Sequence, residues 1–535
     1  MTEIFKKLLA QRGLDENFLY PKYDDLFDSF LMLDMKKAVE RIEVAKENDE
    51  KIAIFGDYDA DGVTASAVLI EALTQFGCRD VKVFLPDRFE DGYGMNKSAV
   101  PRILDYGASL VITVDNGSGS EPTIKELKEA GIDTIVTDHH EIPELPKSAV
   151  AVINPKRDDE RYGKRMAGVG VAFMLARALN ATKNGGQCDG QEKWLLDLVV
   201  IGTICDSMVL RDENRILSYF GMLVLSKTRR VGIKELAKVA GVKLSKINTH
   251  AIGFQLGPRL NAAGRMKSAD LAFELLMSKD RAKAFSLAQE LEELNLERRK
   301  IQEEASRDIE KIYDEEDRVV VASGNWHEGV LGIIAGQIVE KYHKPAFALT
   351  KVGRGELKGS GRSFGDFSLA DVIKKCKSIL LTGGGHAMAC GISLKTSDLK
   401  EFKARVNSFY DSLKLKDQER LLEQATDIEL KDLESVDERL YDEICLLEPF
   451  GEGNAEPLFE SDLLITGRRI LKDKHLSLIM RDKKDNVIKM IAFYAPEEWL
   501  NIDINSRVRA QFSLTKNEWQ GVTKIEGAIT RLKQI

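Results

Sequence analysis

The sequence has 535 residues, of which 43% are hydrophobic and 31% are charged. A chain of this length and composition can form three or four hydrophobic cores, which excludes a disordered protein. No apolar run reaches about 18 residues, so a transmembrane helix is excluded, and the N-terminal stretch MTEIFKKLLAQRG lacks the apolar centre of a signal peptide. We therefore expect a cytoplasmic protein that does not enter a membrane. The net charge of −8 excludes a uniformly basic surface but allows a local basic groove.

The cysteines are far apart in the sequence and form no CxxC pair. They are Cys78, Cys188, Cys205, Cys376, Cys390 and Cys445. This spacing excludes a zinc knuckle and does not suggest a disulfide framework, so we expect free thiols.

Between Lys51 and Ser207, short β-branched apolar runs alternate with helical patterns. The runs are KIAIF, VKVFL, LVITV, TIVT and AVAVI. This alternation predicts βα units around a mostly parallel sheet. The carboxyl ends of its strands are the expected position of a functional site.

Residues 279–323 contain no Gly or Pro and are rich in Glu, Lys, Arg and Leu. These residues are strong helix formers, and Leu287, Leu291 and Leu294 recur at roughly helical spacing. The pattern predicts a connecting helix of about 50 Å, at a rise of 1.5 Å per residue. A surface helix that belongs to one flanking domain is the alternative.

After this helix, the segments RVVVASG, GVLGIIAGQIVEKY and PAFALT predict a strand, a helix and a second strand. A second α/β domain therefore begins near Asp317 and ends near Tyr410. From about Leu458, short β-rich segments separated by turn residues predict a small β-barrel. The fold class is α/β with a C-terminal barrel, and the expected domain bounds are 1–278, 279–318 for the connecting helix, 319–415 and 416–535.

The segment AIFGDYDADG carries an aspartate at every second position after an apolar strand: Asp57, Asp59 and Asp61. In an extended segment these side chains point to one side, where like charges repel each other at close range. The pattern therefore predicts a bound cation.

Three later segments place acidic or imidazole groups where a strand or an apolar helix ends. They carry Asp115, then Asp138 with His139 and His140, and finally Asp206. Because parallel sheets collect their sites at one edge, we expect these groups to converge. Carboxylates and imidazole without cysteine favour Mn²⁺, with Mg²⁺ as a substitute, and two such ions would support phosphoester hydrolysis.

Each of these segments also has a simpler explanation when it is taken alone. An aspartate after a strand commonly caps a turn or a helix, and a single DHH tripeptide can arise by chance or for structural reasons. The four segments together favour a metal site. Val63 stands where a P-loop carries lysine, so the sequence does not support nucleotide hydrolysis of the P-loop type.

The segments DYDADG, VDNGS, TDHH and GTICD resemble, in this order, the four signature motifs of the DHH phosphoesterase superfamily. Nearly the whole chain resembles one family within it, the bacterial RecJ exonucleases that degrade single-stranded DNA from the 5′ end. Further matching segments are GPRLNAAGRM, NWHEGVLGIIAGQIVEKYHKP, GSGRS, GGGHAMACGISL and PFGEGNAEPLF. The resemblance implies a parallel-sheet DHH domain, a DHH-associated domain and a C-terminal OB-fold.

The resemblance also implies roles for individual residues. The metal ligands would be Asp57, Asp59, Asp61, Asp115, His139 and Asp206, with Asp115 bridging two ions. His140 would contact the scissile phosphate and His386 would lie near it. Arg88, Arg259, Ser360 and Arg362 would bind phosphate at the 5′ end. The role of Asp57 stays open between ligand and support for the ligands; His386 could be structural, and Gly359 and Gly361 could simply form a turn.

Two segments of this acidic protein are locally basic. Residues 350–378 have seven basic and three acidic side chains, and residues 464–490 have eight and three. The second segment precedes Phe493, Tyr494 and Trp519, which could stack on bases or belong to the barrel core. Together with the resemblance, these features predict a groove for single-stranded DNA.

Three functions are compatible with these features. The first is a 5′-to-3′ exonuclease that hydrolyses single-stranded DNA to mononucleotides in recombination and repair. The second is an oligonucleotide or cyclic-dinucleotide phosphodiesterase of the same superfamily, although its members lack the β-rich tail. The third is a DNA-binding scaffold without activity. For the exonuclease, the resemblance implies a monomer that acts with a single-stranded-DNA-binding protein and a helicase.

Overall fold

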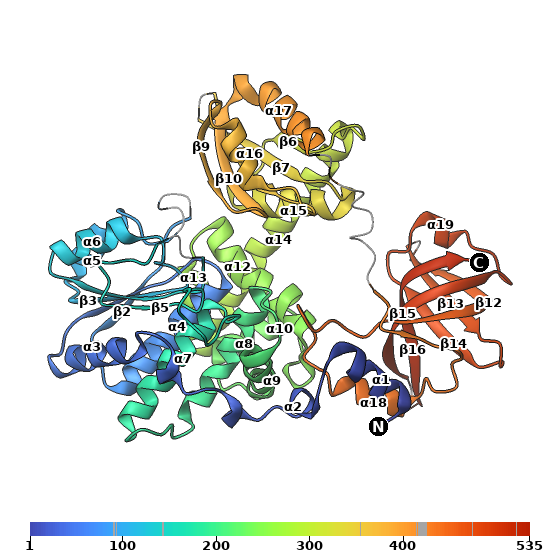
Figure 1. Cartoon of the computed structure of the whole chain (residues 1–535), viewed down its shortest axis with the longest axis horizontal. Coiled ribbons are helices and arrows are strands. Elements are labelled where there is room, and N and C mark those ends of the chain that lie inside the picture. Colours follow the sequence, from blue (N-terminus) through green and yellow to red (C-terminus); the bar gives the residue numbers. More distant parts are fainter. Residues whose placement is uncertain are drawn as a thin grey trace. The chain divides into compact units, whose positions relative to one another are not determined.

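The computed structural model describes residues 1–88, 91, 94–141, 144–353, 355–413, 415, 425–472, 474–519 and 522–535, with the side chains of 519 and 522 excepted. The chain divides into two compact units. The large unit comprises Ser29–Asp206 and Val224–Glu423, and the small unit comprises Met1–Asp28, Ser207–Leu223 and Gln424–Ile535. Figure 1 shows their elements along the chain.

The large unit begins with a five-stranded parallel sheet in the order β2-β1-β3-β4-β5. Its strands are β1 (Ile52–Phe55), β2 (Val81–Phe84), β3 (Leu110–Val114), β4 (Asp133–Thr137) and β5 (Ala151–Ile153). The chain order reverses between β1 and β3, and the carboxyl ends beside such a switch point are the usual ligand position in open α/β sheets. Phe55 lies beside Thr113, and Val114 beside Thr137, so the segments after β1, β3 and β4 leave the sheet at one edge.

Helices cover both faces of this sheet. The helices are α3 (Met35–Glu47), α4 (Ala60–Phe76), α5 (Ala99–Tyr106), α6 (Glu121–Glu129) and α7 (Gly168–Lys183). One face packs Phe55 and Val111 against Ile103 of α5 and Leu127 of α6. Helices α3, α4 and α7 contact the sheet as well, and α4 and α7 are buried along most of their length because their sequences are largely apolar.

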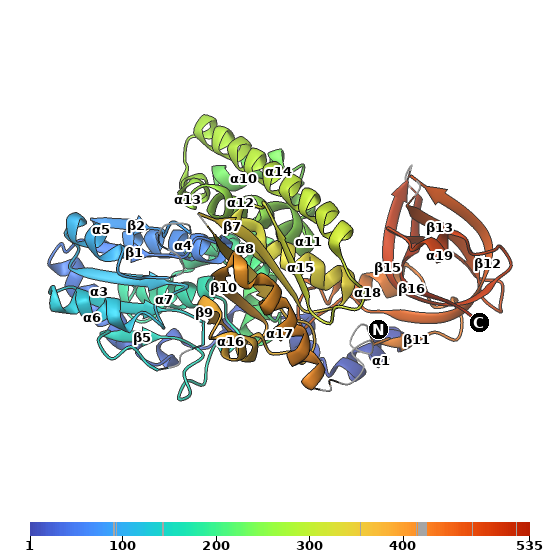
Figure 2. The same ribbon diagram turned by 90° about the horizontal axis from the view of Figure 1, so that it is seen from above.

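A helical layer follows the sheet. It contains η3 (Gln191–Leu195), α8 (Leu196–Cys205), α10 (Val231–Val239), η4 (Leu244–Lys246), α11 (Thr249–Ala251), the π-helical turn η5 (Ile252–Leu256), α12 (Gly257–Met266) and α13 (Asp270–Met277). Next comes α14 (Arg281–Ile312), whose 32 residues span about 48 Å at 1.5 Å per residue. Figure 2 shows α14 as one long rod. It contacts α10, α12 and α13 on one side and α15 and β6 on the other, as expected of a connecting helix.

The second sheet of the large unit has the order β6-β7-β8-β10-β9 and is antiparallel except for the β6–β7 pair. Its strands are β6 (Val320–Gly324), β7 (Ala346–Val352), β8 (Glu356–Arg362), β9 (Leu380–Gly385) and β10 (Ala389–Lys395). Its helices are η6 (Glu328–Val330), α15 (Leu331–Tyr342), α16 (Leu369–Cys376), η7 (Thr396–Asp398) and α17 (Leu399–Ser412). Gly359 and Gly361 lie within β8, so the turn considered for them is wrong. A Cβ at Gly361 would lie 2.7 Å from Cys390 Sγ, so glycine permits the close strand packing.

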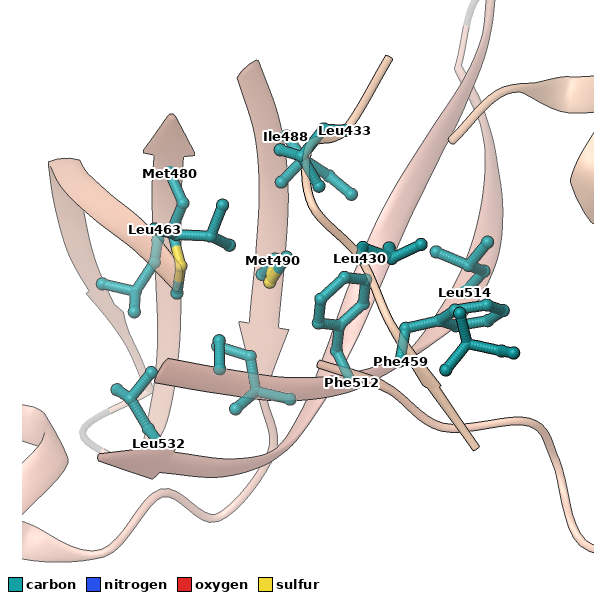
Figure 3. Close-up of a cluster of buried hydrophobic side chains, with 14 of the residues drawn as sticks. Leu430, Leu433, Phe459, Leu463, Met480, Ile488, Met490, Phe512, Leu514 and Leu532 are labelled. Carbon is teal, nitrogen blue, oxygen red and sulfur yellow. The ribbon is translucent and has the colours of Figure 1, made fainter. Parts of the chain in front are cut away.

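The small unit contains a closed five-stranded barrel in the order β12-β13-β14-β16-β15, with β15 pairing back to β12. Its strands are β12 (Phe459–Leu471), β13 (His475–Arg481), β14 (Val487–Ala492), β15 (Arg507–Trp519) and β16 (Val522–Gln534), with α19 (Glu497–Leu500) between β14 and β15. This closed five-strand order with a helix after the third strand is that of an OB-fold. Figure 3 shows Phe459, Phe512, Met480 and Met490 among the side chains that fill its core.

The small unit also includes segments from far away in the sequence. They are α1 (Glu3–Arg12), α2 (Glu16–Leu19), η1 (Tyr23–Asp25), most of α9 (Asp212–Ser226), β11 (Ile428–Glu429) and α18 (Glu438–Cys445), whereas η2 (Ser29–Leu31) belongs to the large unit. Phe5 and Leu8 of α1 are fully buried in the barrel's apolar cluster, and Arg12 forms a bidentate ion pair with Asp427 at 2.6 Å. The N-terminal 28 residues therefore cluster with the barrel, whereas the expected bounds of 1–278 placed them in the first domain.

All six cysteines are free thiols. Within the part of the chain that the structure describes, no helix is both long and apolar enough to cross a membrane.

Candidate metal centre

The turn after β1 supplies the first three carboxylates. Asp57 is buried, and its Oδ1 has no hydrogen-bond partner among the described residues. Asp59 is the N-cap of α4, and its Oδ1 accepts hydrogen bonds from the backbone N–H groups of Asp61 (2.9 Å) and Gly62 (3.0 Å). Asp61 lies in the first turn of α4 and accepts from the N–H groups of Gly168 (2.7 Å) and Val169 (2.9 Å) at the start of α7. Helix capping was the alternative role for these aspartates, and Asp59 does cap α4.

The remaining predicted ligands come to the same place from β3, β4 and α8. Asp115 follows β3 in the left-handed region with φ 62°, His139 follows β4, and Asp206 ends α8. His139 Nε2 lies 3.0 Å from Asp115 Oδ1, 3.6 Å from Asp206 Oδ2 and 3.8 Å from Asp61 Oδ2. Segments almost 150 residues apart thus meet at one sheet edge.

Their potential ligand atoms form three overlapping groups, within each of which the atoms lie no more than 4.8 Å apart. The groups are Asp57, Asp59 and Asp115; Asp61, His139 and Asp206; and Asp115, His139 and His140. Asp115 and His139 each belong to two groups. The arrangement can therefore hold more than one cation with Asp115 shared between positions, which fits the ligand set expected from the sequence.

Burial and mutual repulsion explain why this cluster needs cations. Burial, reinforced by the neighbouring carboxylates, raises the pKa of Asp57 and of Asp115 well above the ordinary value. The same causes raise the pKa of Asp61 and of Asp206 to about 7. His139 does not supply a compensating charge, because burial lowers its pKa. Oxygen and imidazole donors without sulfur suit Mn²⁺ or Mg²⁺.

His140 is held differently from His139. Its Nδ1 lies 2.8 Å from Oδ1 of the buried Asp138, which also accepts from the backbone N–H groups of His139 and His140, while Asp138 Oδ2 accepts from the Ser118 N–H. Burial opposes both charges, but this pairing outweighs it: the pKa of Asp138 falls to about 2 and that of His140 rises to about 9. Asp138 therefore orients His140 and keeps it cationic at neutral pH.

Several supporting residues were not assigned from the sequence. A Cβ at Gly168 would lie 2.5 Å from Asp115 Oδ1, so only glycine lets α7 donate to Asp61 while Asp115 occupies this position. Asn261 Oδ1 accepts from the Ala60 N–H at 2.8 Å and so fixes the start of α4. Asn261 belongs to the segment GPRLNAAGRM, which the sequence singled out without giving this residue a role.

Three arginines gather in the large unit. Arg88 lies over the Tyr58 ring at 4.7 Å, and Arg265 donates to the Gly329 carbonyl at 3.3 Å. Arg362 on β8 donates to Ser360 Oγ at 3.1 Å and packs against Gly332, where a Cβ would lie 2.8 Å from its Nη2. Burial, reinforced by the charge of Arg88, lowers the pKa of Arg265 to about 10 and also lowers that of Arg362. Cations that repel each other while partly buried favour an anionic ligand.

Two predicted site residues are placed differently. The Arg259 guanidinium forms an ion pair with Glu292 of α14 and donates to the Gln255 carbonyl at 2.6 Å. These contacts hold the Arg259 side chain against α14. His386 is exposed in the turn between β9 and β10, and no contact of its ring with the metal cluster is found among the described residues.

Comparison with known proteins agrees with these observations. Models of the DHH family N-terminal domain, the DHHA1 domain and the RecJ OB domain match residues 51–203, 316–412 and 426–530. The chain is 38% identical to the single-stranded-DNA-specific exonuclease RecJ of Bacillus subtilis, covering 98% of this chain and 67% of that protein, and 33% identical to RecJ of Dickeya dadantii, covering 99% and 96%. The chain belongs to the RecJ family.

A solved structure of a RecJ protein supports the same assignment. RecJ from Thermus thermophilus in complex with Mn²⁺ superimposes with a TM-score of 0.86 at 30% identity, covering 99% of this chain and 76% of that one. The predicted fold class, with a parallel-sheet DHH domain, a DHHA1 domain and an OB barrel, is confirmed. The exact domain bounds and the individual roles of the site residues stay predictions.

Substitution of Gly168 by alanine should weaken metal binding. The added Cβ would overlap Asp115 Oδ1, so Asp115 or the start of α7 must move. We expect Mn²⁺ affinity, measured by titration calorimetry, to fall at least about 10-fold, the lower limit for loss of a group that supports metal ligands. Gly336→Ala is the matched control, because open space surrounds that position. Unchanged Mn²⁺ affinity in Gly168→Ala would contradict this role.

Mn²⁺ affinity should depend steeply on pH. Protons and cations compete for Asp61 and Asp206, whose pKa values near 7 exceed those of ordinary carboxyls. If both carboxyls lose their protons on binding, apparent affinity falls about 100-fold between pH 8 and pH 6. Because these folded-state pKa values are raised, the metal-free protein loses stability as pH rises from about 4 through 7. The rise in melting temperature caused by Mn²⁺ should therefore be larger at pH 8 than at pH 6, and equal rises would disprove the competition.

Proposed function

We propose that this protein is a metal-dependent exonuclease that hydrolyses single-stranded DNA from the 5′ end to mononucleotides. The observation that carries the proposal is the cluster of Asp57, Asp59, Asp61, Asp115, His139 and Asp206, four of which are buried, in a member of the RecJ family. The B. subtilis and D. dadantii relatives bear the name single-stranded-DNA-specific exonuclease, and structures of the T. thermophilus relative contain Mn²⁺ or Mg²⁺.

The chain's own residues would have separate roles in hydrolysis of the phosphodiester. Asp59, Asp61, Asp115, His139 and Asp206 would hold two ions, with Asp57 as a ligand or a support for the ligands. When bound, Mn²⁺ or Mg²⁺ supplies an activated water and stabilises charge on the phosphoryl oxygens. His140, fixed by Asp138 and cationic, would bind a non-bridging phosphate oxygen and stabilise the charge that develops there.

A second group of residues would hold the 5′ phosphate. Arg88, Arg362 and Ser360 fit this role, since the two guanidinium groups influence each other electrostatically and Arg362 is oriented by Ser360. We add Arg265 to this set, because burial and neighbouring cations leave it in need of an anion. Arg259 fits less well, since Glu292 already neutralises it.

The barrel would contribute to binding of the single strand. Phe493 and Tyr494 are 65% and 72% exposed, so the core position considered for them is wrong. Both rings lie edge-on to His475, and Lys474 lies 5.2 Å from the Tyr494 ring centre. Exposed aromatic rings beside basic groups suit sequence-tolerant binding of a single strand. The side chain of Trp519 lies outside the described residues.

Membership of the RecJ family supports the wider setting. We infer a monomer in the cytoplasm that acts in recombination and repair with a single-stranded-DNA-binding protein and a helicase. An oligonucleotide or cyclic-dinucleotide phosphodiesterase is the alternative, which the OB barrel disfavours because the members of the superfamily with those activities lack such a domain.

The function is tested with a long single strand and a dinucleotide in the presence of Mn²⁺. We expect release of mononucleotides from the long strand and a higher kcat/KM for it than for the dinucleotide. Asp115→Asn keeps the size of the side chain but removes its charge, and should lower kcat at least about 100-fold. Unchanged circular dichroism would show that the variant is folded. Failure to release mononucleotides from any single strand would refute the exonuclease.

Recognition of the 5′ end is tested by Arg362→Gln. Loss of charge-assisted hydrogen bonds to phosphate should raise KM about 10- to 150-fold on a 5′-phosphorylated strand. A 5′-hydroxyl strand is the matched control, because it lacks the anion and should show little difference between the variant and the parent protein. An equal rise in KM on both strands would argue against this role.

A further inference from the structure

An unusual aromatic pair lies outside the metal centre. Phe254 is 72% exposed, and its ring stacks on that of His250 with centroids 4.8 Å apart and planes 26° from parallel. Phe254 belongs to the π-helical turn η5, between α11 and α12. Single π-helical turns within helices commonly mark functional sites. The turn thus presents a large flat ring to solvent.

This turn packs directly against the end of α8. A Cβ at Gly253 would lie 3.8 Å from Ile204 Cγ2, and one at Gly257 would lie 2.4 Å from Cys205 Sγ. Asp206, a candidate metal ligand, directly follows Cys205 and is the C-cap residue of α8. On its other side, η5 continues into α12, which carries Asn261 and Arg265. Phe254 is therefore positioned between the elements that carry Asp206 and Arg265.

The charge of this segment suits a polyanion. Residues 236–269 contain no Asp or Glu, whereas the whole chain has a net charge of −8. Its basic side chains are Lys238, Lys243, Lys246, Arg259, Arg265 and Lys267. Lys243 and Lys246 precede the aromatic pair, are exposed, and form no ion pair with any described residue. Lys238, Arg259 and Lys267 pair with acidic residues outside the segment, so its available positive charge lies mainly on Lys243 and Lys246. These lysines and the exposed Phe254 ring combine the two features of a single-strand platform.

We propose that Phe254, supported by His250, stacks on a base of the single strand close to the metal centre, while Lys243 and Lys246 contact the strand's phosphates. This inference rests on the proposed exonuclease function and adds a base-binding position to it. Every base has a flat π face, so such a position would grip the strand without selecting its sequence. Phe254 would contact the substrate directly, and His250 would position its ring.

The first experiment measures steady-state kinetics on an oligothymidine in the presence of Mn²⁺. Phe254→Ala should raise KM about 5- to 150-fold, the range found when a base-stacking aromatic residue is removed, with kcat changed less than KM. Phe254→Trp should keep KM near that of the parent protein, because it preserves a flat ring. Phe285→Ala is the matched control, because Phe285 is also a helical phenylalanine open to solvent; it lies on α14 and is 44% exposed.

The second experiment identifies the base that stacks. A series of strands carries a single abasic nucleotide at successive positions from the 5′ end. The parent protein should show a raised KM at one position, and Phe254→Ala should be insensitive to the abasic site at that same position. Such non-additivity is what direct contact predicts. A structural role of Phe254 would raise KM equally for every strand in the series.

The outcomes separate this inference from the function on which it rests. If the parent protein degrades single strands but Phe254→Ala matches it on intact and abasic strands, the stacking position is disproved and the exonuclease stands. If the parent protein degrades no single strand, both are disproved. If Phe254→Ala acts normally on DNA but loses binding to another protein, the surface is a protein-docking site and the inference is again overturned.

Discussion

Repulsion among buried carboxylates is the constraint around which the large unit is built. Asp57, Asp61 and Asp115 are each at most 2% exposed and face one another at the edge of a parallel sheet. Burial removes the water that would screen them, so the metal-free cluster resists ionisation near neutral pH. The surrounding elements either donate hydrogen bonds to these groups or leave room for cations between them.

The protein itself offsets part of this charge. The first N–H groups of α7 donate to Asp61, and those of α4 donate to Asp59, so two helix N-termini face the carboxylates with their partial positive charge. The negative charge of Asp138 is offset by His140, so Asp138 needs no metal ion. Among the described residues, neither Asp57 Oδ1 nor Asp115 Oδ1 has a hydrogen-bond donor. Asp115 also holds a left-handed backbone conformation, which costs free energy and is retained where surrounding packing imposes it.

The large unit also contains a group of positive charges, formed by Arg88, Arg265 and Arg362. Burial and the charge of Arg88 lower the pKa of Arg265 and of Arg362, so these cations are destabilised, as the buried carboxylates are destabilised as anions. A phosphodiester strand supplies negative charge and divalent ions supply positive charge. Substrate and metals together would therefore relieve both clusters, which explains why neither is neutralised by the fold alone. Arg259 shows the contrast, because it forms an ion pair with Glu292.

The sequence by itself determined the strands of the first sheet and their parallel arrangement. It also determined that Asp57, Asp115, His139 and Asp206 lie near one another, because this depends on local periodicity and on the rule that parallel strands end at one edge. Only the tertiary structure decided that Gly168 makes room for Asp115 and that Asn261 fixes the start of α4. It also decided that Arg259 pairs with Glu292 and that α1 packs into the barrel core. Each of these depends on contact between residues more than 30 positions apart in the chain. Local spacing carries no information on such contacts, because side-chain packing and hydrogen bonding across elements arise only when the chain has folded.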